Sequence, residues 1–201
     1  MITILSALLF LSPAQAADCS YDRAALIALD EDRFDQDLGG GWRALANRGC
    51  EHAAAEAIRD WREAHKAELS TLFWHEGQMR ANAGETDAAI GLFQRARKRT
   101  GGDQGGAWAL YVDGSIAFLR GDKDGLEAAR AKLAATPRPA DFDEVARDDK
   151  GKPILMPDGS PWRIQWPLNL GVLDSLRRCW GQTYKQAYAC PRAAATKQEG
   201  S

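Results

Sequence analysis

The sequence has no marked excess of charge of either sign and few cysteines. It contains 26 lysines and arginines against 28 aspartates and glutamates, which gives a formal net charge of −2. Proteins that bind nucleic acids usually carry a clustered basic excess, so this balance argues against that class. Four cysteines among 201 residues are too few to replace a hydrophobic core, and 45% hydrophobic residues is typical of a globular chain that builds one.

Long apolar runs are missing except at the N-terminus. Residues 1–16 read MITILSALLFLSPAQA, an apolar stretch that ends in Pro13 and an Ala-x-Ala triplet but lacks an early Lys or Arg. A membrane span needs about twenty apolar residues, whereas a shorter run before small residues is typical of a signal peptide. We therefore expect a signal peptide at 1–16, a periplasmic or secreted protein, and no stable membrane anchor. A buried N-terminal helix is the alternative.

Several motifs that mark chemical sites are missing or incomplete. No Cys-x-x-Cys pair is present, and Met79 stands where a zinc helix that begins with His75 and Glu76 would need its second histidine. The stretch 99–106 is glycine-rich but lacks the Gly-Lys-Ser/Thr of a phosphate-binding loop, so we expect a flexible loop there. No Gly-x-Ser-x-Gly motif occurs. The sequence therefore predicts no metal, no cofactor and no catalytic set.

The cysteines form an even set, which suits disulfide bonding in an oxidising compartment. Three pairings are possible. We favour Cys19–Cys50 and Cys179–Cys190, because the two pairs lie at opposite ends of the mature chain. The second pair cannot close along one straight helix, where eleven residues span roughly 16 Å. That pairing therefore requires a bend, and Gly181 is the expected place.

The middle of the chain repeats a helix–turn–helix pattern three times. A glycine between two helix-length segments recurs about every 36 residues, at Gly49, Gly84 and Gly121. Two further glycines, Gly77 and Gly114, precede the turn glycine by seven residues in the second and third copies. Small residues let helix backbones approach closely, and a helix pair that cannot bury its own apolar face must stack on its neighbours.

This pattern resembles the tetratricopeptide repeat, a helical hairpin of about 34 residues. The matching residues are Gly77, Gly84, Ala89, Phe93 and Ala96 in the second copy, Gly114, Gly121 and Pro137 in the third, and Gly49 and Ala54 in the first. The resemblance covers roughly 36–137 and implies a mainly α-helical stack of about three hairpins. The alternative is a helical bundle without a repeat architecture.

The resemblance also implies a binding groove, because ligands of that family contact mostly the first helix of each hairpin. Carried onto this sequence, the partner-binding positions are Arg43, Asn47, Trp74, Gln78, Asn82, Tyr111 and Ser115. Aromatic area combined with amide groups suits a protein or peptide partner. The alternative is that Trp74, Tyr111 and Phe118 belong to the core, which we favour for Phe118, or that the C-terminal segments fill the groove.

The chain changes character after Pro137. Frequent prolines exclude long helices, and the apolar stretches 154–156 and 162–166 flank a Pro-Asp-Gly-Ser turn. This pattern predicts a small β-hairpin that packs against the helices, followed by a helix over 168–188 that breaks near Gly181.

The predicted parts of the chain are therefore four: a signal peptide at 1–16, a tetratricopeptide-like helical region at 17–137, a β-hairpin with a disulfide-closed helix at 138–192, and a disordered tail at 193–201. In the helical region we expect a first helix over 21–29, capped by Ser20. A second helical stretch over 30–38 is expected to turn Phe34 inward.

These features lead to the hypothesis of a non-enzymatic periplasmic module that binds a protein or peptide. An inhibitor or immunity-type protein and an envelope assembly factor are two versions of it. One alternative is a hydrolase that uses a groove carboxylate such as Glu56 or Glu76, and it predicts a carboxylate in a cleft with a pKa raised by burial. A structural component of the envelope is the other alternative.

Overall fold

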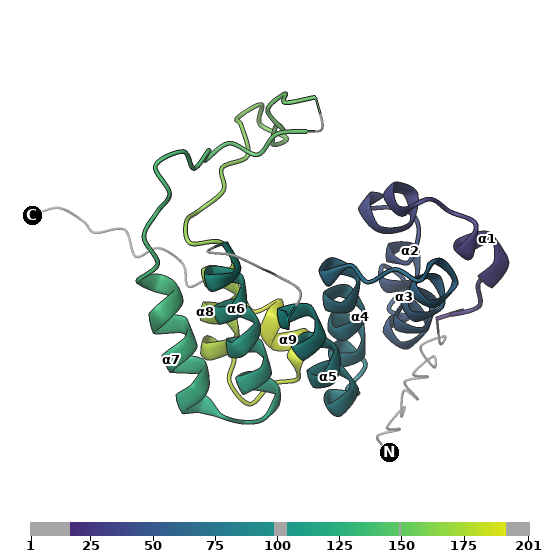
Figure 1. Cartoon of the computed structure of the whole chain (residues 1–201), viewed down its shortest axis with the longest axis horizontal. Coiled ribbons are helices and arrows are strands. Elements are labelled where there is room, and N and C mark those ends of the chain that lie inside the picture. Colours follow the sequence, from purple (N-terminus) through teal and green to yellow (C-terminus); the bar gives the residue numbers. More distant parts are fainter. Residues whose placement is uncertain (1–16, 99–103, 149, 192–201) are drawn as a thin grey trace, which may run out of the picture.

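The computed structural model describes residues 17–98, 104–148 and 150–191, which are mainly α-helical (Figure 1). The expected signal peptide and the expected tail at 193–201 lie outside these residues. Within them, no helix is long and apolar enough to cross a membrane.

The N-terminal part contains short elements around one long helix. These are α1 (Arg23–Ile27), the π-helical turn η1 (Asp32–Gln36), α2 (Arg43–Ala46) and α3 (Glu51–His65). Helix α1 begins later than expected because Asp22, not Ser20, caps it by accepting a hydrogen bond from the Ala25 amide at 3.0 Å. Phe34 points inward and is fully buried, as predicted. Helix α2 has only four residues and follows three glycines, of which Gly41 has a left-handed φ of +49° that favours glycine.

The middle of the chain consists of two helix pairs. They are α4 (Ser70–Asn82) with α5 (Thr86–Lys98), and α6 (Gln104–Leu119) with α7 (Lys123–Ala134). The glycines within their turns, Gly84 and Gly121, have left-handed φ values of 82° and 68°, and Gly49 before α3 has 80°. Their predicted role as turn residues is confirmed. The loop expected over 99–106 is wrong at its end, because α6 already begins at Gln104.

Two glycines inside helices allow close packing. A Cβ atom on Gly77 would lie 2.6 Å from the Phe93 ring, and a Cβ atom on Gly114 would lie 2.8 Å from the Leu173 side chain. Leu173 belongs to α8 (Leu170–Arg178), which packs on α6 and α7. Neighbouring helices thus pack in chain order, and the assignment to the tetratricopeptide family stays a prediction.

Both predicted disulfides are present. Cys19–Cys50 joins the N-terminal segment to the start of α3, with 5.4 Å between the Cα atoms. Cys179–Cys190 closes the C-terminal end over 6.1 Å. The chain bends at Gly181, whose φ is +86°, and resumes as α9 (Tyr184–Tyr188). The predicted break in this helix is confirmed.

Residues 138–168, here called the arm, leave the helical body after α7 and return to it before α8 (Figure 1). The predicted β-hairpin is wrong, because the described part of the arm contains isolated β-bridges and no strands. Its turn does form, with the Gly159 amide donating to the Met156 carbonyl at 2.9 Å. Three short segments pair with one another, where the prediction had two strands pairing across the turn. The arm also projects from the helices rather than packing along them (Figure 1).

Candidate functional site

The arm is held by rings of backbone hydrogen bonds. The Ala146 amide donates to the Trp162 carbonyl at 2.9 Å, the Trp162 amide to the Ile154 carbonyl at 2.8 Å, and the Ile154 amide to the Ala146 carbonyl at 2.8 Å. Successive donors in this ring are eight residues apart. In a second set with the same donor spacing, the amides of Asp148, Met156 and Ile164 donate to the carbonyls of Lys152, Ser160 and Glu144, at 2.7–2.9 Å. The segments 144–148, 152–156 and 160–164 therefore form a closed cycle, in which each pairs with both others.

The base of the arm is tied together by side chains. The indole Nε1 of Trp166 donates to the Thr136 carbonyl at 2.9 Å, so the returning chain is bonded to the departing chain. The Trp166 ring also meets the Phe142 ring edge-on at 5.1 Å between centroids. Glu144 forms ion pairs with Arg138 at 2.6 Å and with Arg163 at 3.3 Å. These contacts join the departing and returning ends of the arm to each other.

The arm exposes large apolar side chains. Leu155 is 58% exposed and Trp162 52% exposed, and Ile154, Met156 and Leu168 are also exposed. These five make up most of the exposed large hydrophobic residues of the described chain. Exposed large apolar side chains are therefore concentrated in the arm, and such concentrations commonly mark interaction sites.

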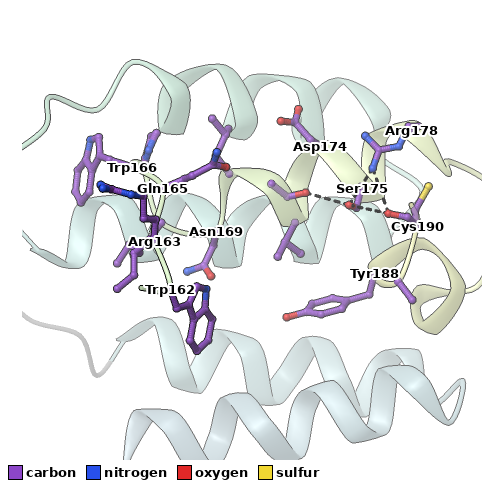
Figure 2. A pocket seen from close by; sticks show the side chains of 17 residues that line it. Trp162, Arg163, Gln165, Trp166, Asn169, Asp174, Ser175, Arg178, Tyr188 and Cys190 are labelled. Atoms are coloured by element: carbon purple, nitrogen blue, oxygen red, sulfur yellow. Dashed lines mark hydrogen bonds between the residues drawn. The ribbon is translucent and has the colours of Figure 1, made fainter. Parts of the chain in front are cut away.

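A cleft of about 980 Å³, here called the arm cleft, lies between the base of the arm and helices α8 and α9 (Figure 2). Trp162 lines it on the arm side and Tyr188 on the body side, and the Tyr188 ring points toward Trp162 (Figure 2). Arg178 lines it from the end of α8, next to Ser175 and the Cys190 carbonyl. The cleft thus combines aromatic faces with a cation.

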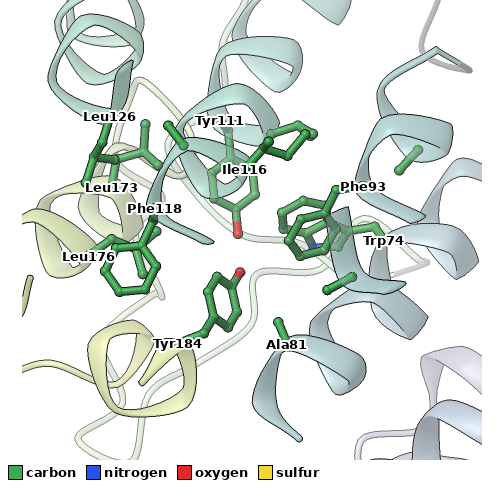
Figure 3. Close-up of a cluster of buried hydrophobic side chains, with 14 of the residues drawn as sticks. Trp74, Ala81, Phe93, Tyr111, Ile116, Phe118, Leu126, Leu173, Leu176 and Tyr184 are labelled. Carbon is green, nitrogen blue, oxygen red and sulfur yellow. The ribbon is translucent and has the colours of Figure 1, made fainter. Parts of the chain in front are cut away.

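The predicted groove is largely filled by the protein itself. Trp74, Tyr111 and Ser115 are buried, with Tyr111 only 2% exposed, and Phe118 is buried as we favoured. Tyr184 of α9 lies 6.1 Å from the Phe93 ring and 6.1 Å from the Phe118 ring, and its hydroxyl end points toward Tyr111 (Figure 3). Helix α9 therefore covers these residues and places them in the core, out of reach of a partner.

Two predicted residues of α4 remain half-buried, Gln78 and Asn82. Asn82 lines a second cleft of about 610 Å³ between the α4–α5 turn, the α6–α7 turn and the segment from Trp180 to Lys185, which includes the start of α9. Its Oδ1 atom is buried without a hydrogen-bond partner. This cleft is what remains of the predicted groove near the helix ends.

The remaining two predicted residues, Arg43 and Asn47, make hydrogen bonds to backbone carbonyls in the N-terminal part of the protein. The Arg43 guanidinium donates to the Asp35 carbonyl and lies 4.2 Å from the Trp42 ring centroid. The exposed Asn47 donates from Nδ2 to the Leu38 carbonyl at 3.3 Å. The seven predicted groove residues therefore do not form one accessible surface.

Asp35 organises a buried polar cluster between η1, α2 and α4. Its carboxylate accepts hydrogen bonds from Trp42 Nε1 at 2.9 Å and from His75 Nδ1 at 2.8 Å, and Arg43 lies 3.5 Å away. Burial acts to raise the pKa of Asp35, but the bonds from His75 and Trp42 and the charge of Arg43 outweigh it and leave the pKa below its usual value. The cluster therefore holds an ionised carboxylate inside the protein.

Glu76, a candidate of the hydrolase alternative, is buried against α3. Burial raises the pKa of its carboxyl group, as that alternative predicts, while Arg62 opposes the shift. Arg62 donates to Oε2 from Nε at 3.0 Å and from Nη2 at 2.7 Å, so the pair braces α3 against α4. Glu56 in turn is bound by Arg59 and Arg80. Neither glutamate lines any of the four best-defined cavities of the described chain.

Sequence reasoning missed the arm cleft and the cyclic pairing of the arm. A signal for the pairing was present, because Gly151 and Gly159, and likewise Pro153 and Pro161, are eight residues apart. The cleft had no such signal, because it joins residues near 162 to residues near 188 only through the fold. A comparison of the chain with family models, curated proteins and solved structures finds no match.

Proposed function

We propose that the protein is a non-enzymatic module that binds another polypeptide, with the arm as its binding element. One observation carries the proposal: a segment with a fixed backbone presents Ile154, Leu155, Met156 and Trp162 to solvent. Tryptophan is enriched among residues that dominate binding energy, and methionine adapts to irregular partner surfaces.

The fixed backbone of the arm supports the interpretation that its exposed apolar side chains bind a partner. A partner that docks on an ordered segment does not have to order it, so less conformational entropy is lost on association. The closed cycle of three segments also leaves none of them as an unpaired sheet edge. We therefore expect side-chain contacts rather than the addition of a partner strand.

The proposal includes a place of action. Two disulfides support an oxidising compartment, and the predicted signal peptide at 1–16 supports the periplasm or the exterior. In this interpretation the stacked helices, which resemble tetratricopeptide hairpins, form a scaffold whose groove holds the protein's own α9. An inhibitor or immunity-type protein and an envelope assembly factor would both use such a displayed arm.

Site-specific photo-crosslinking in cells that export the protein tests this role. A photoreactive residue at Leu155 should give one defined protein adduct, and excess wild-type protein should compete with it, whereas the Trp162→Ser variant should not. The matched control is Leu38, which is 78% exposed but lies outside the arm. Absence of an adduct at 155, or equal adducts at both positions, would contradict the proposal.

A further inference from the structure

We propose that the arm cleft binds an extended polypeptide segment in which a carboxylate side chain stands close to a large apolar one. This inference rests on the proposed function, because it names the chemistry of the segment that the partner presents. It adds a second contact surface to the exposed side chains of Ile154, Leu155 and Met156.

The cleft has the size and place of a binding site. Its volume of about 980 Å³ is at the upper end of the range typical of ligand sites, roughly 300–1,000 Å³. It lies between the arm on one side and α8 with α9 on the other, and the returning end of the arm leads directly into α8 (Figure 2). A segment of a few residues therefore has room in the cleft.

The apolar part of the cleft is aromatic and exposed. In the part of the chain that the structure describes, Trp162 and Tyr188 are the aromatic residues with large exposure, and both line this one cleft. Tyr188 is 37% exposed although it belongs to a helix whose other aromatic residue, Tyr184, is buried. Two rings that flank one space offer area to a large apolar side chain at a low cost in conformational entropy.

The charged part of the cleft is Arg178. Its Nη2 atom donates to the Ser175 hydroxyl and to the Cys190 carbonyl, both at 3.2 Å, so neutral acceptors fix the guanidinium. Within the described residues, no carboxylate forms an ion pair with Arg178. Asp174, one turn earlier on α8, pairs with Arg130 at 2.8 Å instead. The donors on Nε and Nη1 remain for a ligand, and a fixed guanidinium favours a carboxylate, which accepts charge-assisted hydrogen bonds from it.

The rest of the lining suits a polypeptide backbone. Gln165 and Asn169 line the cleft with exposed amide side chains, each of which can both donate to a carbonyl and accept from an amide. Arg163, at the other end from Arg178, adds a second positive charge, which Glu144 partly offsets at 3.3 Å (Figure 2). The cleft therefore favours a segment with a negative charge over a neutral or basic one.

Fluorescence anisotropy of labelled peptides with the full chain tests this. The probes are acetylated and amidated hexapeptides in which Asp or Glu stands one to three residues from Phe, Trp or Leu, with Gln and Asn versions as the uncharged panel. We expect acidic members to bind at least tenfold more tightly than their uncharged versions. Arg178→Gln should remove that difference, and Trp162→Ala should weaken binding of the whole panel.

Arg177→Gln is the matched control, because Arg177 neighbours Arg178 on α8 but does not line the cleft. It should change affinity less than twofold, and circular dichroism should show all variants folded. Equal binding of both panels, an equal loss in Arg177→Gln, or binding only to peptides with a free C-terminal carboxylate would overturn the inference. A concentration-dependent dimer that Arg178→Gln abolishes would overturn it as well. An adduct at Leu155 together with any of these results would leave the proposed function intact.

Discussion

The helical body and the arm use apolar side chains in opposite ways. In the body, Trp74 stacks on Phe93 at 4.2 Å and Tyr184 covers the inner face, so aromatic packing holds the helices together (Figure 3). In the arm, backbone hydrogen bonds hold the chain, and Leu155 and Trp162 remain in water. Side-chain changes should therefore act on stability in the body and on binding in the arm.

The largest effect is expected where the body buries charge. Glu76→Ala leaves Arg62 buried without its partner, and breaking such a pair costs about 3–5 kcal/mol of unfolding free energy. Urea unfolding followed by circular dichroism measures this. The double variant Arg62→Met, Glu76→Leu should regain most of the loss, because it removes both charges. A loss below about 1 kcal/mol in Glu76→Ala would contradict the bracing role.

A smaller loss of unfolding free energy is expected when the C-terminal disulfide is removed. Replacing Cys179 and Cys190 by serine should lower the unfolding free energy by about 2–3 kcal/mol, because the short loop gains freedom in the unfolded chain. It should also release α9 from the groove, which limited proteolysis would detect as new cleavage between α8 and α9. The corresponding serine variant of Cys19 and Cys50 should leave that region protected. Equal cleavage in both variants would contradict the idea that this disulfide holds α9 in place.

The Asp35 cluster should make stability depend on pH. The pKa of Asp35 is lower in the folded protein than its ordinary value of 3.8, so its contribution is present above that value and is lost as the pH falls through the folded pKa. Asp35→Asn should therefore cost about 1–2 kcal/mol near pH 7, and the cost should shrink as the pH falls below 3.8 and through the folded pKa. Urea unfolding over this range measures the difference, and a cost that does not change with pH would contradict an ionised Asp35.

The smallest effect on stability is expected in the arm. Leu155→Ser should change the unfolding free energy by less than about 0.5 kcal/mol, because the side chain is exposed, and yet it should reduce capture of the partner. Leu126→Ser is the matched change in the body, where the side chain is fully buried, and it should cost several times more. Similar costs for the two variants would remove the distinction between body and arm.

Local chemistry made much of the body predictable. Turn glycines such as Gly84 and Gly121 must adopt a left-handed backbone, and Gly77 is needed where Phe93 approaches, so these positions identify helix pairs from sequence alone. The Cys179–Cys190 pair followed from the positions of the cysteines at the ends of the chain, and the break at Gly181 followed from that pair, because a straight helix cannot close it. Each of these inferences depends on neighbours in the chain.

The features that the sequence did not predict depend on distant contacts. Tyr184 fills the groove because a bend and a disulfide bring α9 back against α4 and α6. The residues next to Trp74 and Tyr111 in the sequence give no sign that α9 covers them. In the arm, a turn between two apolar stretches is typical of a hairpin, but the third segment, around Ala146, enters the pairing as well. Two-residue periodicity does not identify a cycle of three segments.

Amide hydrogen exchange of the isolated protein, measured by NMR, tests the ordered arm most directly. Ile154 and Leu155 are neighbours with similar side chains, but the Ile154 amide donates to the Ala146 carbonyl at 2.8 Å, and the Leu155 amide has no backbone acceptor in the described chain. We predict slow exchange at Ala146, Ile154 and Trp162 and fast exchange at Leu155. Exchange of all four at the rate of an unstructured chain would show that the arm is not preorganised and would contradict its role as a binding element.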